Sequence, residues 1–288
     1  MKSLLDVILL SETYLKERGV SRPRREAEDL IAFVLKLKRL DLYLQFERPL
    51  NEEELEKCRE VVKRRGKREP FAYICQEIVF SDLVLKVTPH VLIPRQETEI
   101  LVEKIAVKLA TIPLDNKILW DMCTGSGCIG LALKKKFPQL NVFLSDISKE
   151  ALLIAEENAR LNNLEVHFRS GDLFEAFKGE KCDFFICNPP YVSEDDYRLL
   201  DPEVRAFEPK LALVGGKRGL SLYERLSKEL KNYFNSNFLA WFEIGTGQGI
   251  EIKKIFNDQR IYSSHIEMDW AGHDRFFFLE SVPSFQVS

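Results

Sequence analysis

The feature that most restricts the fold of this chain is an apolar strand that runs directly into a glycine-rich loop and then a helix. Residues 117–120 (Lys-Ile-Leu-Trp) predict the strand, and residues 131–137 predict the helix. The glycines between them have the spacing G-x-G-x-x-G, at Gly125, Gly127 and Gly130. Counting this one, strands are predicted near residues 117–121, 141–146, 165–168, 182–187, 237–244, 261–267 and 275–280. This alternation of strands and helices indicates an α/β fold with a mostly parallel, doubly wound sheet that binds ligands at the carboxyl ends of its strands.

The N-terminal part of the chain lacks this pattern and has helical periodicity instead. Apolar residues mark one amphipathic helix between residues 4 and 15, and a second helix that begins after Ser21. A third is predicted to begin at Asn51, because its first turn is acidic, its last turn is basic and Gly66 follows as a stop. We therefore expect a small helical domain over residues 1–72.

A predicted hairpin follows the helical domain. Residues 73–80 and 83–87 have strand character and are separated by two turn residues, so we place a linker over residues 73–92 and a second domain over residues 93–288. The basic residues 63–68 allow two interpretations: contact with RNA or an acidic partner, or a solvated helix end.

The second domain is predicted to open with a helix over residues 97–109. Arg95, Glu97 and Glu99 lie together at its start. They either face a cofactor or substrate chain, or form an ordinary helix N-terminus with acids near the positive end of the dipole.

Two aspartates narrow the choice of ligand for the glycine loop. Asp146 ends the next predicted strand, an arrangement that also fits a dinucleotide site or a β–α turn without a ligand. Asp121 ends the strand before the loop, where a carboxylate favours a cationic ligand and repels a pyrophosphate. S-adenosylmethionine carries a sulfonium, an ammonium and a ribose but no phosphate. The sequence therefore favours it as the cofactor, with Asp146 accepting hydrogen bonds from both ribose hydroxyls.

Further cofactor contacts are predicted along the loop and after the third strand. The loop residues whose backbone can approach the methionine and ribose parts are Cys123, Thr124, Gly125, Ser126 and Gly127. Asp172 can place a carboxylate near the adenine amino group, although Gly171-Asp172 is also a plain turn sequence.

A second glycine cluster, residues 245–249, also follows a predicted strand, and acids recur at Glu267 and Asp269. We do not assign the cofactor to it, because the first cluster adjoins Asp121 and lies at the sheet edge where the next motif is expected. We predict a tight turn that helps to shape the substrate side.

That next motif is the tetrapeptide Asn188, Pro189, Pro190 and Tyr191, which follows the strand predicted over residues 182–187. Two consecutive prolines remove two backbone donors, so the local main chain offers acceptors. The Asn188 side-chain oxygen and the Pro189 carbonyl can accept both hydrogens of a planar amino group, with the Tyr191 ring against its π-face. This arrangement suits methyl transfer to a conjugated nitrogen, and Asn188 is also a predicted cofactor contact. The alternative is a simple turn.

Together these segments resemble the release-factor glutamine methyltransferases, which methylate the side-chain amide of a glutamine in class 1 peptide chain release factors. The similarity covers roughly residues 68–280 and is carried by residues 68–74, 91–99, 121–127, 146–152, 188–191, 207–220, 243–248 and 273–275. Cys123 and Gln76 depart from it, since the family usually has glycine at both positions. Leu173, a further predicted cofactor contact, stands where some relatives carry an aromatic residue beside the adenine.

The resemblance implies seven strands with the last antiparallel, S-adenosylmethionine as cofactor, and substrate recognition by the N-terminal domain. It also implies methylation of the glutamine in the Gly-Gly-Gln loop of release factors, with Asn188, Pro189, Pro190 and Tyr191 as catalytic and substrate-binding residues.

Other functions are compatible with parts of the sequence. An adenine amino-group methyltransferase acting on DNA or RNA is the alternative, because that amino group is also planar and conjugated. Such an enzyme needs a basic groove and a strand-recognition domain. An NAD-dependent dehydrogenase is disfavoured by Asp121 and the tetrapeptide. A non-catalytic interaction protein on the same fold has no reason to keep both ligand loops chemically intact.

The composition is that of an intracellular enzyme. A chain of 288 residues, 45% of them hydrophobic, can bury one large core and a smaller second one. A net charge of −3 gives no general attraction to nucleic acid, so we expect no stable nucleic-acid binding. No window has the ~18 apolar residues of a membrane span. The 6 cysteines form no C-x-x-C pair, which predicts free thiols, no metal site and a cytoplasmic location.

Overall fold

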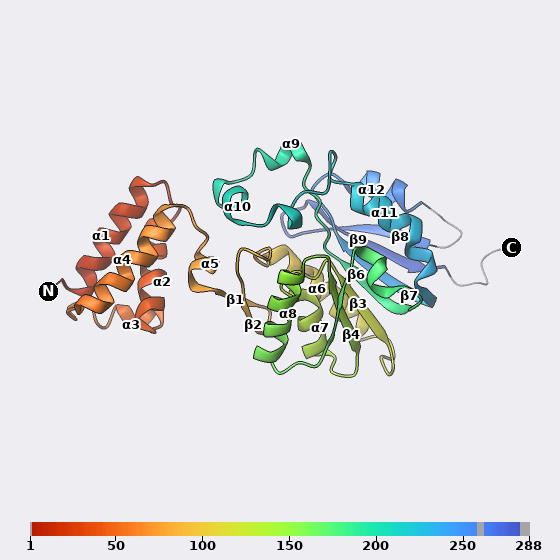
Figure 1. Ribbon diagram of the computed structural model, residues 1–288, viewed down its shortest axis with the longest axis horizontal. Coiled ribbons are helices and arrows are strands. Elements are labelled where there is room, and N and C mark those ends of the chain that lie inside the picture. The colour runs from red at the N-terminus through yellow and green to blue at the C-terminus, as the bar shows by residue number, and fades with distance from the viewer. Residues whose placement is uncertain (1, 258–261, 283–288) are drawn as a thin grey trace. The chain divides into compact units, whose positions relative to one another are not determined.

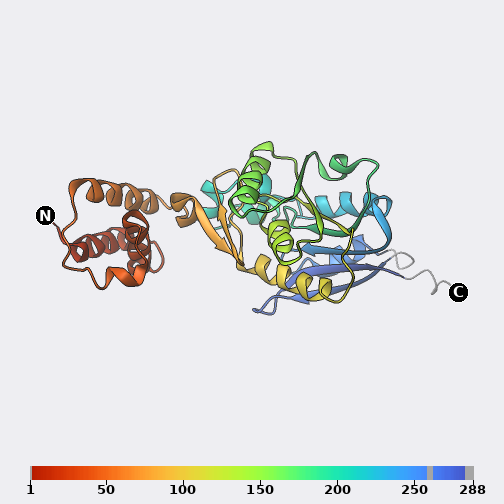
Figure 2. The ribbon, with the colours of Figure 1, turned by 90° about the horizontal axis from the view of Figure 1, so that it is seen from below.

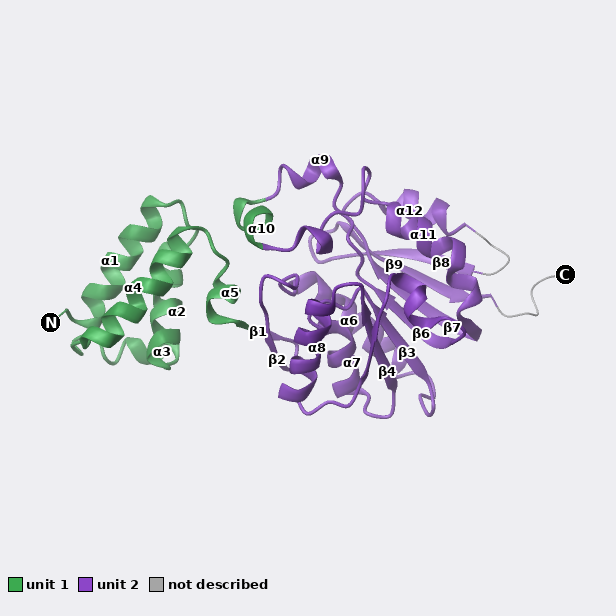
Figure 3. Cartoon of the chain, in the orientation of Figure 1, with its two compact units in different colours: residues 1–77, 201–207 green, residues 78–200, 208–288 purple. Residues whose placement is uncertain are grey.

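The computed structural model describes residues 2–257 and 262–282, and the chain forms two compact units (Figures 1 and 3). Unit 1 holds residues 1–77 and 201–207, and unit 2 holds residues 78–200 and 208–288. The chain therefore leaves unit 2 for a short return to unit 1 between residues 201 and 207. Among the described residues, no helix combines the length and apolar character that a membrane crossing requires.

Unit 1 is helical, as the sequence predicts. Its elements are α1 (Leu4–Glu17), α2 (Pro23–Leu35), α3 (Arg39–Leu42), α4 (Glu52–Gly66), α5 (Phe71–Cys75) and α10 (Pro202–Phe207). The start of α4 is confirmed, because the Asn51 side chain accepts a hydrogen bond from the Glu54 N–H in a capping box. Gly66 differs from the prediction: it is the last residue of α4 and not a stop beyond it.

Residues 71–75 correct the prediction of a strand that begins at residue 73. They form α5, because the Pro70 carbonyl accepts hydrogen bonds from the N–H groups of Tyr73 and Ile74 and so starts a helical turn. The turn ends at Gln76, whose φ of 59° is left-handed. The hairpin itself is confirmed, and its strands are β1 (Glu77–Phe80) and β2 (Leu83–Lys86).

The basic cluster at the end of α4 is engaged within unit 1. Arg64 donates two hydrogen bonds to Glu69, at 2.9 and 2.6 Å. Arg65, whose side chain is 3% exposed, pairs with Glu26 at 2.7 Å and with Glu203 of α10 at 3.1 Å. The interpretation as a solvated helix end therefore fits the exposed Lys63 and Lys67, whereas Arg65 is buried and paired within unit 1.

Unit 2 is built on a sheet with the order β5-β4-β3-β6-β7-β9-β8. The strands are β3 (Ile118–Met122), β4 (Asn141–Asp146), β5 (His167–Ser170), β6 (Cys182–Cys187), β7 (Phe234–Glu243), β8 (Tyr262–Met268) and β9 (Asp274–Ser281). β9 pairs antiparallel with both of its neighbours, and the pairings among β3 to β7 are parallel. The predicted seven-stranded, doubly wound sheet with an antiparallel last strand is therefore confirmed.

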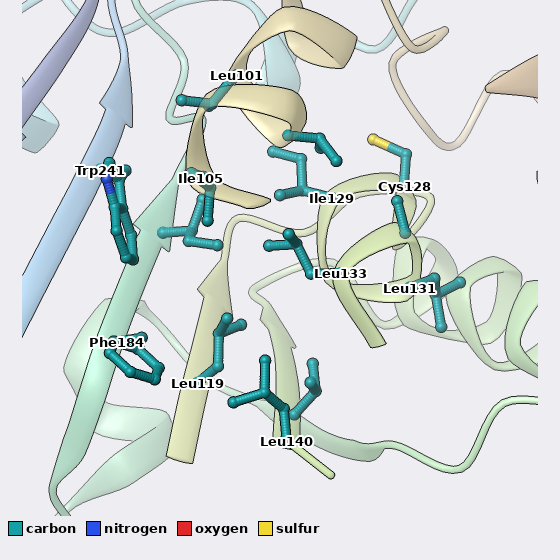
Figure 4. Close-up of a cluster of buried hydrophobic side chains, with 14 of the residues drawn as sticks. Leu101, Ile105, Leu119, Cys128, Ile129, Leu131, Leu133, Leu140, Phe184 and Trp241 are labelled. Carbon is teal, nitrogen blue, oxygen red and sulfur yellow. The ribbon is translucent and has the colours of Figure 1, made fainter. Parts of the chain in front are cut away.

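Alternating strand residues bury the two faces of this sheet. Leu119, Phe184 and Trp241 point into one hydrophobic cluster, which Figure 4 shows beneath α6 (Gln96–Leu109) and α7 (Cys128–Lys136). The residues next to them in sequence, such as Trp120 and Phe185, belong to the cluster on the other face. That face is covered by a short 3₁₀ helix, η1 (Leu173–Phe177), by α11 (Ser221–Glu229) and by α12 (Gly249–Ile255). The strands and helices can be followed in Figures 1 and 2.

The strand order reverses between β3 and β6. After β3 the chain adds β4 and β5 on one side, and then β6 and β7 on the other. Ligands of open α/β sheets bind beyond the carboxyl ends of the strands at such a switch point. The glycine loop follows β3 and the tetrapeptide follows β6, so the fold brings these two motifs to the switch point.

Candidate functional site

A cavity of about 430 Å³ lies at the switch point of unit 2. This volume lies within the range of about 300–1,000 Å³ typical of small-molecule sites. Its walls come from the carboxyl ends of β3, β4 and β6, from residues 89–98 and from the returning segment 209–225. The predicted site residues that line it are Cys123, Thr124, Gly125, Ser126, Asp146, Asp172, Leu173, Asn188 and Pro190. Glycine loop and tetrapeptide thus share one cavity.

Asp121 lies beneath the glycine loop and supports its shape. Its Oδ2 accepts hydrogen bonds from the Thr124 hydroxyl at 2.6 Å and from the Gly130 N–H at 2.9 Å. Its Oδ1 is buried and has no partner among the residues that the structure describes. Burial raises the pKa of Asp121 to about 7. The Gly130 N–H that donates to this carboxylate belongs to the first turn of α7. A dinucleotide site would use such an N–H group to bind pyrophosphate.

The loop itself adopts left-handed backbone angles at three positions. Cys123, Gly125 and Gly127 have φ values of 59°, 55° and 82°. Gly127 caps α7 and does not appear in the cavity wall, whereas Gly125 faces open space there. Cys123 thus keeps a backbone conformation that favours glycine, which explains why the related family usually has glycine at that position.

Asp146 stands in the cavity wall at the end of β4. Its two oxygens accept hydrogen bonds from the N–H groups of Gly125 and Ser148, both at 2.9 Å. Burial raises the pKa of Asp146, and the N–H donors oppose that change. This side chain joins the glycine loop to the start of the next helix, α8 (Lys149–Leu161).

The third strand, β5, ends two residues later than predicted. The cavity residues Asp172 and Leu173 come shortly after its end. Asp172 lines the cavity, but its Oδ2 pairs with Arg225 of α11 at 2.8 Å. Leu173 is buried, with a left-handed φ of 51° that is unusual for a bulky side chain. Both residues line the cavity, and their contact with the adenine end of a cofactor stays a prediction.

The tetrapeptide extends β6 to the cavity. Asn188 and Pro190 line it, whereas Pro189 is buried and Tyr191 is half-buried behind them. The Tyr191 hydroxyl donates to Glu243 Oε1 at 3.2 Å, and its carbonyl accepts from the Gln248 side-chain amide at 2.9 Å. Tyr191 thus fixes the end of the motif through both its side chain and its backbone carbonyl.

Several residues that support the tetrapeptide were not predicted as site residues. Gly215 and Gly219 pass so close to it that a side chain would overlap the carbonyls of Pro190 and Tyr191. Their cluster in a loop was the signal for such a close approach. Glu243 also accepts from the Thr98 hydroxyl at 2.7 Å. Tertiary contacts of this kind, between strand ends far apart in sequence, leave no local pattern.

Charged side chains at the start of α6 contact other parts of unit 2. Arg95 pairs with the buried Glu208, which also accepts from the Ile93 N–H at 3.1 Å. Glu99 accepts from the Ser81 N–H. Of residues 94–99, Pro94 and Thr98 line the cavity. Arg95 and Glu99 thus bind within unit 2, and whether the segment also faces a cofactor or substrate chain stays a prediction.

Comparison with known proteins covers both units. Residues 7–75 match the family model described as PrmC N-terminal domain, and residues 96–202 match the one described as methyltransferase small domain. The chain is 44% identical over 275 residues to the release factor glutamine methyltransferase of Chlamydia trachomatis, covering 96% of this chain and 93% of that one. It is 38% identical over 262 residues to that of Geobacter sulfurreducens, covering 91% of each.

Solved structures share the fold. The hMettl16 catalytic domain has a TM-score of 0.54 at 13% identity, over 82% of this chain and 84% of that one. The 16S rRNA N2 G1207 methyltransferase of T. Thermophilus has a TM-score of 0.52 at 12% identity, over 72% of this chain and 50% of that one. At such identities the likeness extends to the fold and no further.

Proposed function

We propose, from the premise that this chain belongs to the family of release factor glutamine methyltransferases, that it methylates a glutamine side-chain amide in class 1 peptide chain release factors. The observation that carries the proposal is the shared cavity, in which Asn188 lies with Asp146 and Gly125. A cofactor bound by the glycine loop and an amide bound by the tetrapeptide then meet in one place.

The residues of the cavity fit S-adenosylmethionine. Asp146 offers carboxylate oxygens for ribose hydroxyls, and Gly125 leaves open space above the loop. Asp121 Oδ1, which has no partner in the described part of the chain, lies beneath the same loop, and a nearby cationic ligand favours the ionised form of such a carboxyl. A pyrophosphate fits less well, because Asp121 already occupies the Gly130 N–H.

Within this cavity the chain's own residues position the acceptor. S-adenosylmethionine, when bound, supplies the methyl group to be transferred. An amide nitrogen is a poor nucleophile, because its lone pair is delocalised into the carbonyl, so positioning supplies much of the rate. The Asn188 side-chain oxygen and the Pro189 carbonyl accept the two amide hydrogens and stabilise the positive charge that grows on nitrogen. A dedicated base is not required, because the methylated nitrogen is strongly acidic.

The same proposal assigns the remaining groups. Tyr191 lies against the face of the amide, and Asp172 and Leu173 bind the adenine end of the cofactor. Unit 1 recognises the release factor, and the protein acts in the cytoplasm, where translation takes place. The target is the glutamine of the Gly-Gly-Gln loop.

The test is methyl transfer from labelled S-adenosylmethionine to purified release factor, with duplex DNA and RNA in parallel reactions. We expect a single methyl group, which mass spectrometry locates on the loop glutamine. A release factor with alanine in place of that glutamine is the matched control and should stay unlabelled. Label in DNA or RNA instead would replace the proposed substrate by the adenine alternative.

A further inference from the structure

The end of β7 carries a buried acid beside the tetrapeptide. In the register of β6 and β7, Cys187 pairs with Phe242, so the next residues along, Asn188 and Glu243, lie side by side at the edge of the sheet. The Glu243 side chain is 1% exposed. Its two oxygens accept from two hydroxyl groups, those of Thr98 at 2.7 Å and Tyr191 at 3.2 Å. Glu243 therefore joins the start of α6 to the tetrapeptide.

Among the residues that the structure describes, Arg275 opposes by its charge the rise that burial causes in the pKa of this acid, but it donates its hydrogen bonds elsewhere. Arg275 donates to the Ile244 carbonyl, to Thr246 and to Asp269. Burying a carboxylate is costly unless strong partners offset the loss of water, and burial raises the pKa of Glu243. A hydrophobic residue would fill this position at lower cost. The position thus calls for an explanation beyond packing.

Resting on the proposed function, we propose that Glu243 is a positioning residue for methyl transfer, which fixes the Tyr191 ring against the reacting amide through the tyrosine hydroxyl. A carboxylate has two oxygens that can accept from two hydroxyls at once. The hydrogen bond from Thr98 fixes the orientation of the carboxylate. The hydrogen bond from Tyr191 to the same carboxylate then fixes the orientation of the tyrosine ring. Glutamine has the same shape but one acceptor oxygen, so it reproduces the packing and weakens the hold on one hydroxyl.

A double-mutant cycle separates this role from a purely structural one. Glu243→Gln removes the charge from this contact and Tyr191→Phe removes its donor, so each should lower kcat for release factor about tenfold, the usual loss for a hydrogen bond to a charged group. The double variant should lose little more than either single variant, because residues that act through one contact are not additive. The Kd for S-adenosylmethionine should change less than twofold, since the contact lies behind the tetrapeptide.

Asp183→Asn is the matched control. Asp183 is also buried, at the opposite end of the neighbouring strand β6, where it accepts from Lys117 and the Ile118 N–H. It should lower the melting temperature and leave kcat unchanged. Independent losses that multiply to about a hundredfold in the Glu243→Gln/Tyr191→Phe double variant would overturn the inference, as would an unchanged kcat in either single variant.

The readouts also separate this inference from the function on which it rests. A parent protein that leaves release factor unmethylated contradicts the proposed function, and the positioning role with it. A parent that methylates release factor with an additive cycle contradicts the positioning role alone. If Glu243→Gln does not fold, Tyr191→Phe decides the matter, because an unchanged kcat in that variant refutes the inference.

Discussion

The two glycine clusters of unit 2 look alike in sequence but differ in their surroundings and in the residues that they support. Both follow a sheet strand and lead into a helix: residues 123–127 lie between β3 and α7, and residues 245–249 follow β7 and end at the first residue of α12. In the first loop Gly125 faces open space, and its N–H meets the cavity-wall residue Asp146. In the second, the Gly245 N–H is taken by the side chain of Gln248 at 2.9 Å. The same side chain continues to the Tyr191 carbonyl at 2.9 Å.

A glycine loop can therefore form a binding site or support a neighbouring segment, depending on which group accepts hydrogen bonds from its backbone N–H groups. The residues of the second loop, all of which the structure describes, do not contribute to the cavity wall. We infer that the first loop governs cofactor affinity, and that the second governs turnover through the tetrapeptide. Four pairs of substitutions test this division.

The largest effect is expected at the tetrapeptide, on which the second loop acts. Asn188→Ala deletes an acceptor for the amide hydrogens, and loss of one preorganised electrostatic group commonly costs about a hundredfold or more in kcat. The Kd for S-adenosylmethionine, measured by calorimetry, should change far less. Asn188→Asp keeps an acceptor but adds charge, so it should bind cofactor at least as well and methylate poorly. Near-parental turnover in Asn188→Ala would mean that the motif is only a turn.

The next effect belongs to the first loop. Asp146→Ala removes the proposed ribose acceptor and frees the N–H groups that it holds, so we expect a loss of cofactor affinity greater than tenfold, corresponding to roughly 1.5–3 kcal/mol. Asp172→Asn is the matched control. It is another acid of the cavity wall, but Arg225 already engages its carboxylate, so its effect should be smaller. Unchanged binding in Asp146→Ala, or tighter binding of NAD by the parent, would show that the cavity has been misassigned.

A substitution in the second loop should have a smaller effect, and this effect should be on kcat and not on the Kd for the cofactor. Gln248→Ala removes the tie to the Tyr191 carbonyl, a neutral hydrogen bond that contributes about 0.5–1.5 kcal/mol. Turnover should fall by roughly threefold to tenfold, with the cofactor Kd unchanged. Gln248→Glu is the sharper variant, because it keeps the acceptor for the Gly245 N–H and lacks the donor for Tyr191. A change in Kd that equals the change in kcat would erase the distinction between the two loops.

The order of strands and the two ligand motifs could be predicted because each has a local signature. Apolar runs with glycine punctuation located the seven strands, and the sequence placed Asn188 and Asp146 at strand ends that the sheet brings together. The partners of Glu243 and Gln248 could not be predicted, because their contacts join segments whose spacing in sequence carries no periodicity. The start of the strand predicted over residues 73–80 was wrong for a related reason: Pro70 begins a helical turn, and the strand pattern in the residues after it does not reveal this.

The smallest effect is a change in stability, and it tests whether the first loop is strained where the second is not. Cys123 has a left-handed φ of 59°, whereas the second loop places Gly247, with a φ of 78°, at its own left-handed position. A residue with a side chain loses about 1–2 kcal/mol of stability in the left-handed conformation. Glycine avoids this strain, but its greater freedom in the unfolded chain lowers stability by roughly 0.5–1 kcal/mol. Cys123→Gly should therefore raise the free energy of unfolding by about 0.5–1 kcal/mol in urea denaturation.

Gly247→Ala is the reciprocal control for that measurement. Its new methyl group would meet no atom within 4 Å, so the loss of about 1 kcal/mol that we expect comes from the backbone angle alone. Cofactor affinity should be unaffected by Gly247→Ala, because this loop serves the tetrapeptide. Cys123 also packs, half-buried, against the core cluster that contains Cys187. If Cys123→Gly lowers stability while Gly247→Ala behaves as expected, that packing outweighs the strain, and the first loop holds its shape through its side chains as the second loop does.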